Sequence, residues 1–253
     1  MGTSDPRGAG MIGEEFSRLP LRRVEVRPDD PPEQGVWPLT IPAVARFAAH
    51  GLDLGAATVL VGENGTGKST LVEAVAMAYG LNAEGGSTGA MNRTYASESG
   101  LHAHLRCIRS GGASRWGFFL RAETMHSFFT HQASAPSPWD PNFHHLSHGE
   151  SFGALLDSSR FEGPGFYVLD EPESALSFTA QLALLGRLID LTADGRSQVL
   201  LSTHSPVLAS LPGARLLELG EWGWRESAWE DLELIDHYRR FLDGPERYLR
   251  YLV

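Results

Sequence analysis

Short apolar runs and segments of helical periodicity alternate along the chain. The runs Thr58–Val61, Phe166–Leu169 and Gln198–Leu201 show no regular alternation of polar and apolar residues, which is typical of strands buried on both faces. Apolar residues at helical spacing follow the first two runs, beginning near Lys68 and just after Ser177. This arrangement favours an α/β fold with a mostly parallel core sheet.

A second set of predicted strands lies outside these runs. Leu21–Val26 and Val36–Ile41 are rich in strand-forming residues, and a proline-rich loop separates them. Alternation over Leu101–Cys107 predicts a strand with one buried face. After a turn at two glycines, Trp116–Leu120 returns as its partner strand. We therefore expect an antiparallel β-subdomain beside the parallel sheet.

Changes in composition divide the chain into regions. Residues 1–15 are rich in Gly, Pro, Ser and charge, which predicts disorder. Residues 16–253 are expected to form a single domain. Prolines and histidines predict a short, loop-rich helical lobe at about residues 122–158. A last strand, Arg215–Leu219, precedes mixed-charge helices that begin after Ser227.

A glycine-rich segment between the first strand and the first helix fits the pattern G-x-x-x-x-G-K-[ST], known as the P-loop. Glycines let the backbone approach a phosphate, and successive N–H groups and the helix N-terminus then bind it. The pattern predicts a three-layer P-loop NTPase sandwich. The expected nucleotide-binding residues are Gly62, Glu63, Asn64, Gly65, Thr66, Gly67, Lys68, Ser69 and Thr70.

Lys68 is the single lysine among 21 basic residues. A compact ammonium on a flexible stem suits a phosphate site, whereas a planar guanidinium would crowd it. We expect Lys68 to contact the β- and γ-phosphates of a nucleotide, and the Ser69 hydroxyl to hold Mg²⁺.

Polar residues that could take part in catalysis or metal binding follow the two later apolar runs. Asp170 and Glu171 end one run, and His204 follows the other. Ligands gather at the carboxyl ends of parallel strands, so these side chains should meet near the P-loop. Asp170 is expected to hold Mg²⁺ with Ser69. Glu171 would deprotonate the attacking water and His204 would bond the γ-phosphate, which makes Glu171, His204 and Lys68 the predicted catalytic residues.

The segment Leu146–Glu150 opens another helical pattern. Ser147 is a good N-cap and Glu150 stands three residues later, so the pair fits a capping box. Capping alone is one interpretation. The spacing to Asp170 favours a second one, in which this helix start binds an anion.

Several residues leave alternatives open. Trp37 or Phe47 could either stack on a base or pack in the core. Histidines that could bind zinc, or simply form polar surface, occur in two groups: His102 and His104, and His144, His145 and His148.

Composition limits the function classes. The net charge of −10 argues against a large DNA- or RNA-binding surface, although four arginines between Arg18 and Arg27 form a local basic patch. The lone Cys107 excludes an internal disulfide framework and a multi-cysteine zinc site. No apolar run approaches the length of about 20 residues needed to cross a membrane, and no secretory signal is recognisable. A cytoplasmic protein without membrane insertion is the expectation.

The motifs, in this order, resemble those of the ABC-type ATPase superfamily over about residues 20–220. Leu146–Glu150 is similar to the signature loop, Ser174–Ser177 to the D-loop, and His204 to the switch histidine. The motif Asp170–Glu173 is similar to that of compact "predicted AAA-type ATPases", a branch related to recombination and repair ATPases. The stretch between Lys68 and Asp170 is too short for a long coiled-coil arm. His148 replaces a usual glycine. Glu123 stands where a glutamine is usual, so the resemblance implies that it could meet Mg²⁺ through a water, or it could have no such role.

The resemblance implies a Mg²⁺-dependent ATPase that sandwiches ATP between two subunits. Ser147, His148, Gly149 and Glu150 of one chain would then face the γ-phosphate held by the other. The implied cofactors are ATP and Mg²⁺, and the implied partner is a second copy, besides an unidentified protein. The driven process would be DNA repair or defence-like. Two alternatives remain, an ATP-binding subunit of a transporter and a nucleotide-switched binding module with little turnover.

Overall fold

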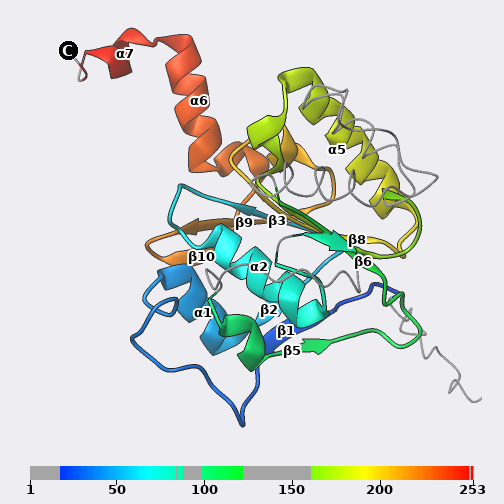
Figure 1. Cartoon of the computed structure of the whole chain (residues 1–253). Helices are drawn as coiled ribbons and strands as arrows, with labels where there is room; N and C mark the ends of the chain where they lie inside the picture. Colours follow the sequence, from blue (N-terminus) through cyan, green and yellow to red (C-terminus); the bar gives the residue numbers. More distant parts are fainter. Residues whose placement is uncertain (1–17, 84, 88–98, 122–160, 251, 253) are drawn as a thin grey trace, which may run out of the picture.

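A seven-stranded sheet forms the centre of the fold in the computed structural model, which describes residues 18–83, 85–87, 99–121, 161–250 and 252 (Figure 1). The strand order is β10-β9-β3-β8-β7-β6-β4. Five neighbouring strands, from β9 to β6, run parallel, and the edge strands β10 and β4 are antiparallel to their neighbours. The strands are β3 (Ala57–Val61), β4 (Gly86–Ser87), β6 (Gly117–Arg121), β7 (Phe166–Asp170), β8 (Gln198–Thr203), β9 (Arg215–Gly220) and β10 (Gly223–Glu226).

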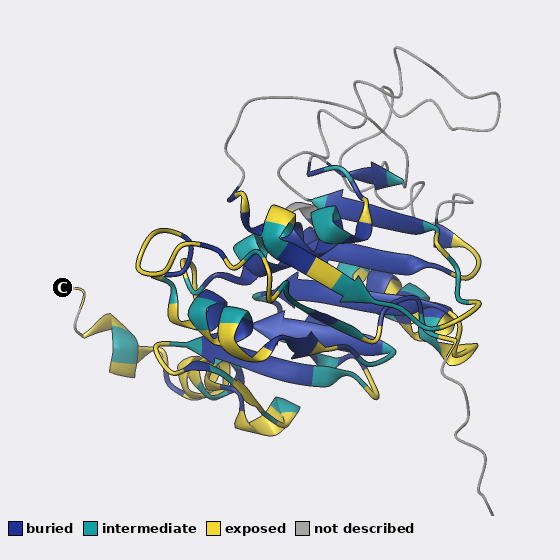
Figure 2. Ribbon diagram, turned by 90° about the horizontal axis from the view of Figure 1, so that it is seen from below, coloured by how far each residue is buried: buried dark blue, intermediate teal, exposed yellow. Residues whose placement is uncertain are grey.

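Helices cover both faces of this sheet. Helix α2 (Lys68–Tyr79) lies on one face and α5 (Phe178–Ala193) on the other (Figure 1). Successive residues of one strand pack into opposite layers: Phe166 and Val168 join the cluster around α2, whereas Tyr167 and Leu169 join the cluster around α5. The central strands are accordingly buried throughout (Figure 2). The predicted three-layer α/β architecture is confirmed.

A small antiparallel sheet packs beside these layers, in the order β2-β1-β5. It contains β1 (Arg23–Val26), β2 (Leu52–Asp53) and β5 (Leu105–Ile108). The predicted hairpin between residues 101–107 and 116–120 is wrong, because β5 pairs with β1 whereas β6 pairs with β7 and β4. Leu101–His104 forms a 3-10 helix, so His102 and His104 do not share a strand face.

The predicted strand Val36–Ile41 is also wrong. This segment is a series of turns that leads into α1 (Pro42–His50), a helix that the sequence analysis did not predict. Pro42 occupies the first turn of α1, where its missing N–H costs no hydrogen bond. Helix α1 buries Ala43, Val44 and Phe47.

The chain continues after the sheet with α6 (Glu233–Asp243) and α7 (Glu246–Leu249), which extend away from the sheet (Figure 1). In the part of the chain that the structure describes, no helix combines the length and apolar character needed to cross a bilayer. The predicted lobe at residues 122–158 and the predicted disorder of residues 1–15 lie outside the described residues.

Candidate functional site

The P-loop connects β3 to α2 at the carboxyl edge of the sheet. Gly65 and Gly67 have φ angles of +81° and +96°, a left-handed region that side-chain-bearing residues rarely adopt. A Cβ at Gly67 would lie 2.9 Å from Cγ2 of Ile41, and one at Gly62 would lie 2.6 Å from the carbonyl oxygen of Leu219. The loop therefore requires glycine for both conformation and space.

The Lys68 side chain lies almost fully inside this loop, with 2% of it exposed. Its Nζ donates to the carbonyl oxygen of Glu63 at 3.1 Å and lies 3.3 Å from Oε1 of Glu171. Burial lowers the pKa of Lys68, and the nearby carboxylates of Glu171, Asp170 and Glu173 oppose this effect. Lys68 is the cation of the loop, and Mg²⁺ held by the neighbouring carboxylates would offset their negative charge when a phosphate binds.

Asp170 ends β7 and is buried next to the start of α2. Its Oδ1 accepts a hydrogen bond from Ser202 Oγ at 2.5 Å. Arg121 Nε lies 3.5 Å from its Oδ2. Burial raises the pKa of Asp170, while Ser202, Arg121 and Ser69 act in the opposite direction.

Ser69 and Asp170 together offer the hard oxygen donors that Mg²⁺ prefers. Ser69 lies near enough to Asp170 to lower the pKa of its carboxyl, so a small cation could contact both from one position. The residues present thus fit a magnesium ion. Within the described residues, no group of three or more His, Cys, Asp and Glu side chains could hold a metal.

Glu171 adopts an unusual backbone conformation, with φ at +47° and ψ at +49°. No other non-glycine residue in the described part of the chain has a positive φ. Its Oε1 lies 2.9 Å from Nε2 of His204 and 3.3 Å from Nζ of Lys68. The carboxylate therefore lies between the predicted switch histidine and the P-loop lysine.

Glu173 was not predicted as a site residue, yet it fixes the position of His204. Its Oε1 accepts a hydrogen bond from Thr203 Oγ1 at 2.8 Å and another from the backbone N–H of His204. These contacts join the segment after β7 to the end of β8. Its position in the Asp-Glu-Pro-Glu motif is the sequence feature that could have identified Glu173 as a site residue.

Ser202 and Arg121 also escaped the sequence analysis. Ser202 Oγ bonds Asp170 from the neighbouring strand, and Arg121 pairs with Glu73 at 2.7 Å besides its contact to Asp170. Only strand register brings these residues to Asp170, since β8 and β6 flank β7. No local pattern in the sequence marks them.

The structure brings Lys68, Ser69, Asp170, Glu171 and His204 together. The other predicted P-loop residues, including Asn64 and Thr70, are in the same loop and first helical turn. Phe47 is fully buried in the core, so of the two interpretations left open for this residue the structure favours core packing. The remaining predicted positions lie outside the described residues: Glu123, Ser147, His148, Gly149 and Glu150, and the histidines at 144 and 145.

Comparison with known protein families gives one match. The family described as "AAA domain, putative AbiEii toxin, Type IV TA system" matches residues 143–210, which include Asp170, Glu171 and His204. No curated protein sequence matches the chain. The match and the observed fold confirm the predicted resemblance to ABC-type P-loop ATPases.

Solved structures with a similar chain path have low sequence identity. A putative metal-chelate type ABC transporter in an inward-facing conformation is 17% identical, with 84% of both chains covered and a TM-score of 0.46. The SMC head domain from Thermotoga maritima is 14% identical, covering 66% of this chain and 88% of its own, with a TM-score of 0.39. A dimeric bacterial ABC transporter cassette is 15% identical, covering 71% and 88%, with a TM-score of 0.39.

Proposed function

We propose that this chain binds ATP and hydrolyses it with Mg²⁺ at the carboxyl edge of the sheet. One observation carries the proposal: a buried lysine in a glycine loop meets the two carboxylates at the end of β7. Lys68 lies 3.3 Å from Glu171, and Ser69 lies near enough to Asp170 to lower the pKa of that carboxyl. Phosphoryl transfer depends mainly on positioning and charge neutralisation, and these residues supply both.

Each residue has a specific role in this proposal. Lys68 neutralises phosphate charge, and Ser69 and Asp170 hold Mg²⁺, which supplies further neutralisation when bound. Glu171 accepts the proton of the attacking water. His204 orients Glu171 through the 2.9 Å contact between Nε2 and Oε1. Binding of a phosphate by Lys68 would replace its ion pair with Glu171 and free that carboxylate to act as a base.

The proposal includes a second copy of the chain. Ser147, His148, Gly149 and Glu150 would complete the site of a partner subunit, as the resemblance to ABC-type ATPases implies. We place the protein in the compact non-transporter branch, acting in the cytoplasm. The process it drives would be DNA repair or defence-like. The matched family's description as a putative toxin of a toxin–antitoxin system supports the defence-like option.

Calorimetric titration with ATP and Mg²⁺ tests the proposal. Lys68→Ala should weaken ATP binding at least about 100-fold, because it removes a buried charge-assisted contact worth several kcal/mol. Arg115→Ala is a matched control, since it removes an exposed cation from the loop before β6. Unchanged ATP affinity in Lys68→Ala, or equal losses in both variants, would contradict the P-loop assignment.

A further inference from the structure

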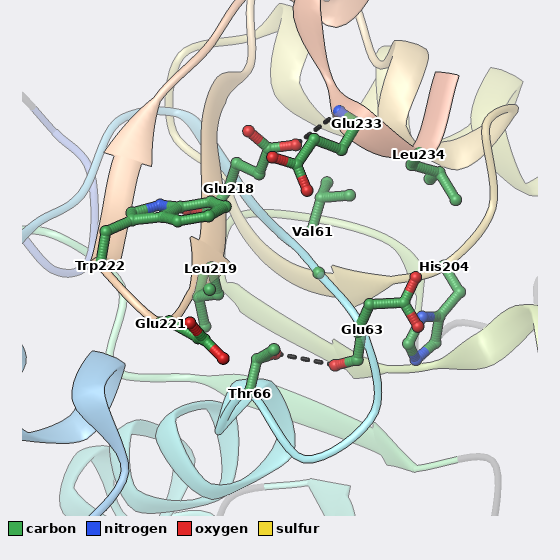
Figure 3. A pocket seen from close by; sticks show the side chains of 12 residues that line it. Val61, Glu63, Thr66, His204, Glu218, Leu219, Glu221, Trp222, Glu233 and Leu234 are labelled. Atoms are coloured by element: carbon green, nitrogen blue, oxygen red, sulfur yellow. Dashed lines mark hydrogen bonds between the residues drawn. The ribbon is translucent and has the colours of Figure 1, made fainter. Parts of the chain in front are cut away.

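A pocket of about 410 Å³ opens beside the P-loop (Figure 3). Its volume falls within the range of about 300–1,000 Å³ that is typical of small-molecule sites. Gly62, Glu63 and Thr66 contribute P-loop surface, and the turn between β9 and β10 forms the opposite wall. His204 and Trp222 lie at opposite ends of the pocket, with Glu63 and Thr66 between them (Figure 3). The pocket is therefore continuous with the candidate phosphate site.

The indole of Trp222 is 43% exposed, but its position is fixed by several contacts. Its Nε1 donates to the carbonyl oxygen of Glu218 at 3.4 Å, and the guanidinium of Arg225 lies 4.4 Å from the ring centroid. The ring edge packs on Gly220, where an added Cβ would lie only 2.7 Å from ring atoms. An exposed aromatic ring held this firmly is a preformed stacking surface.

The charge of the pocket indicates which part of a ligand it accepts. Glu63 and Glu221 contribute carboxylates to its wall, and those of Glu218 and Glu233 are already paired with Arg225 at 2.7 and 3.2 Å. Such a wall repels phosphate and accepts hydrogen bonds from amino and hydroxyl groups. Phosphate is attracted instead to Lys68. The pocket thus suits the uncharged, donor-bearing half of a nucleotide.

The upstream aromatic residues do not offer an equivalent surface. Phe47 is fully buried in the core. Trp37 lies in a separate pocket, whose lining includes Pro32 and His104 but no P-loop residue. Among these three aromatic residues, only Trp222 shares a pocket with the P-loop.

We propose that Trp222 stacks on the base of the nucleotide whose phosphates bind the P-loop, and that Glu221 accepts a hydrogen bond from the base or the ribose. This inference rests on the proposed ATP-binding function. It assigns the base-binding surface to the β9–β10 turn, which lies downstream of all the predicted catalytic residues. Stacking of a base on an aromatic side chain contributes about ten- to a hundred-fold in affinity.

Calorimetry with two ligands separates base binding from phosphate binding. We would titrate ATP and inorganic tripolyphosphate, each with Mg²⁺, into the native chain and the variants Trp222→Ala, Trp222→Phe and Trp37→Ala. Trp222→Ala should lose about ten- to a hundred-fold in ATP affinity, and Trp222→Phe should retain most of it. All four proteins should bind tripolyphosphate equally, and Trp37→Ala should bind ATP as the native chain does.

Three results would overturn the inference, and each has a different meaning. Native ATP affinity in Trp222→Ala, or a loss in Trp37→Ala instead, would show that the base lies elsewhere. Loss of tripolyphosphate binding in Trp222→Ala would show that Trp222 supports the loop rather than the base. If the native chain bound neither ligand, the proposed ATP-binding function itself would fail.

Discussion

Glu171 combines a left-handed backbone conformation with two contacts of its carboxylate at the site. A left-handed conformation costs a non-glycine residue about 1–3 kcal/mol, and such residues cluster at functional sites. Here the strain coincides with contacts to Lys68 at 3.3 Å and His204 at 2.9 Å. The backbone N–H of Glu171 donates to the carbonyl oxygen of Ser202 at 3.1 Å, which helps to hold this conformation. The fold thus maintains an unfavourable conformation where it positions the proposed base.

Asp170 should reduce the stability of the nucleotide-free protein. Burial raises the pKa of its carboxyl, so the folded chain binds this proton more tightly than the unfolded chain does. Stability therefore falls as the pH rises from the ordinary range of an aspartate toward the raised pKa. We expect Asp170→Asn to be more stable than the native chain at pH 7, with a smaller difference at pH 4. Urea unfolding across this pH range measures the effect.

Asp190→Asn is the control, since this exposed carboxylate lies on α5, away from the site. Its effect on unfolding should be small at both pH values. In Asp170→Asn, Arg121 keeps its 2.7 Å ion pair with Glu73, so no buried guanidinium is left without a carboxylate. A variant less stable than the native chain at pH 7 would show that the hydrogen bonds of Asp170 outweigh its burial.

Among the helices and strands, those with purely local signals were the predictable ones. The runs that became β3, β7 and β8 are apolar because helices cover both faces, and that requirement is visible in the sequence. The partners of β5 and β6 were not predictable, because pairing depends on contacts between distant segments. Helix α1 was not predicted, although Pro42 is a sound helix start and Ala43, Val44 and Phe47 have helical spacing.

Gln198 joins the two sheets through hydrogen bonds in the interior. Its Nε2 donates to the carbonyl oxygens of Leu21 and Gly55 at 2.6 and 2.8 Å, and its Oε1 accepts from the N–H of Leu21 at 2.9 Å. Gln198→Leu would leave the N–H and the carbonyl oxygen of the buried Leu21 unpaired, at about 1–3 kcal/mol each, while the partly buried carbonyl of Gly55 can bond water. We expect a loss of about 2–5 kcal/mol in the free energy of unfolding, measured by urea denaturation.

Gln181→Leu is a matched control on α5. This side chain is hydrogen-bonded to the carbonyl oxygen of Leu176 and to Ser205, but it is only partly buried, so water can replace its partners. Its loss should be clearly smaller than that of Gln198→Leu. Equal losses would mean that the link between the two sheets contributes nothing specific to stability.

Across the whole molecule, the candidate site could be predicted because it gathers at one edge of a parallel sheet. Lys68, Asp170 and His204 each follow a recognisable strand, and parallel strands bring their carboxyl ends together. Trp222 had no such signal. Its position beside the P-loop follows from the pairing of β9 with both β3 and β10, which no local pattern encodes.

The proposed assembly can be tested with Glu171→Gln. This variant keeps Lys68, Ser69 and Asp170, so it should bind ATP and Mg²⁺ but lack the base, and turnover should fall about 10²- to 10⁴-fold. Because the bound nucleotide would persist, two chains should stay associated around it. Light scattering after size-exclusion chromatography should therefore show a dimer with ATP and a monomer without it.

Two further variants test whether the loss of turnover is specific to Glu171 and whether the dimer depends on bound ATP. Glu162→Gln changes a carboxylate whose side chain is 63% exposed and which pairs with Arg187 at 3.7 Å, so it should hydrolyse ATP normally. Adding Lys68→Ala to Glu171→Gln should abolish the dimer, because the nucleotide that holds the two copies together would no longer bind. A dimer that persisted in this double variant would form without ATP. Native turnover in Glu171→Gln would remove Glu171 from the role of base, and the strained conformation of this residue would then need a structural explanation.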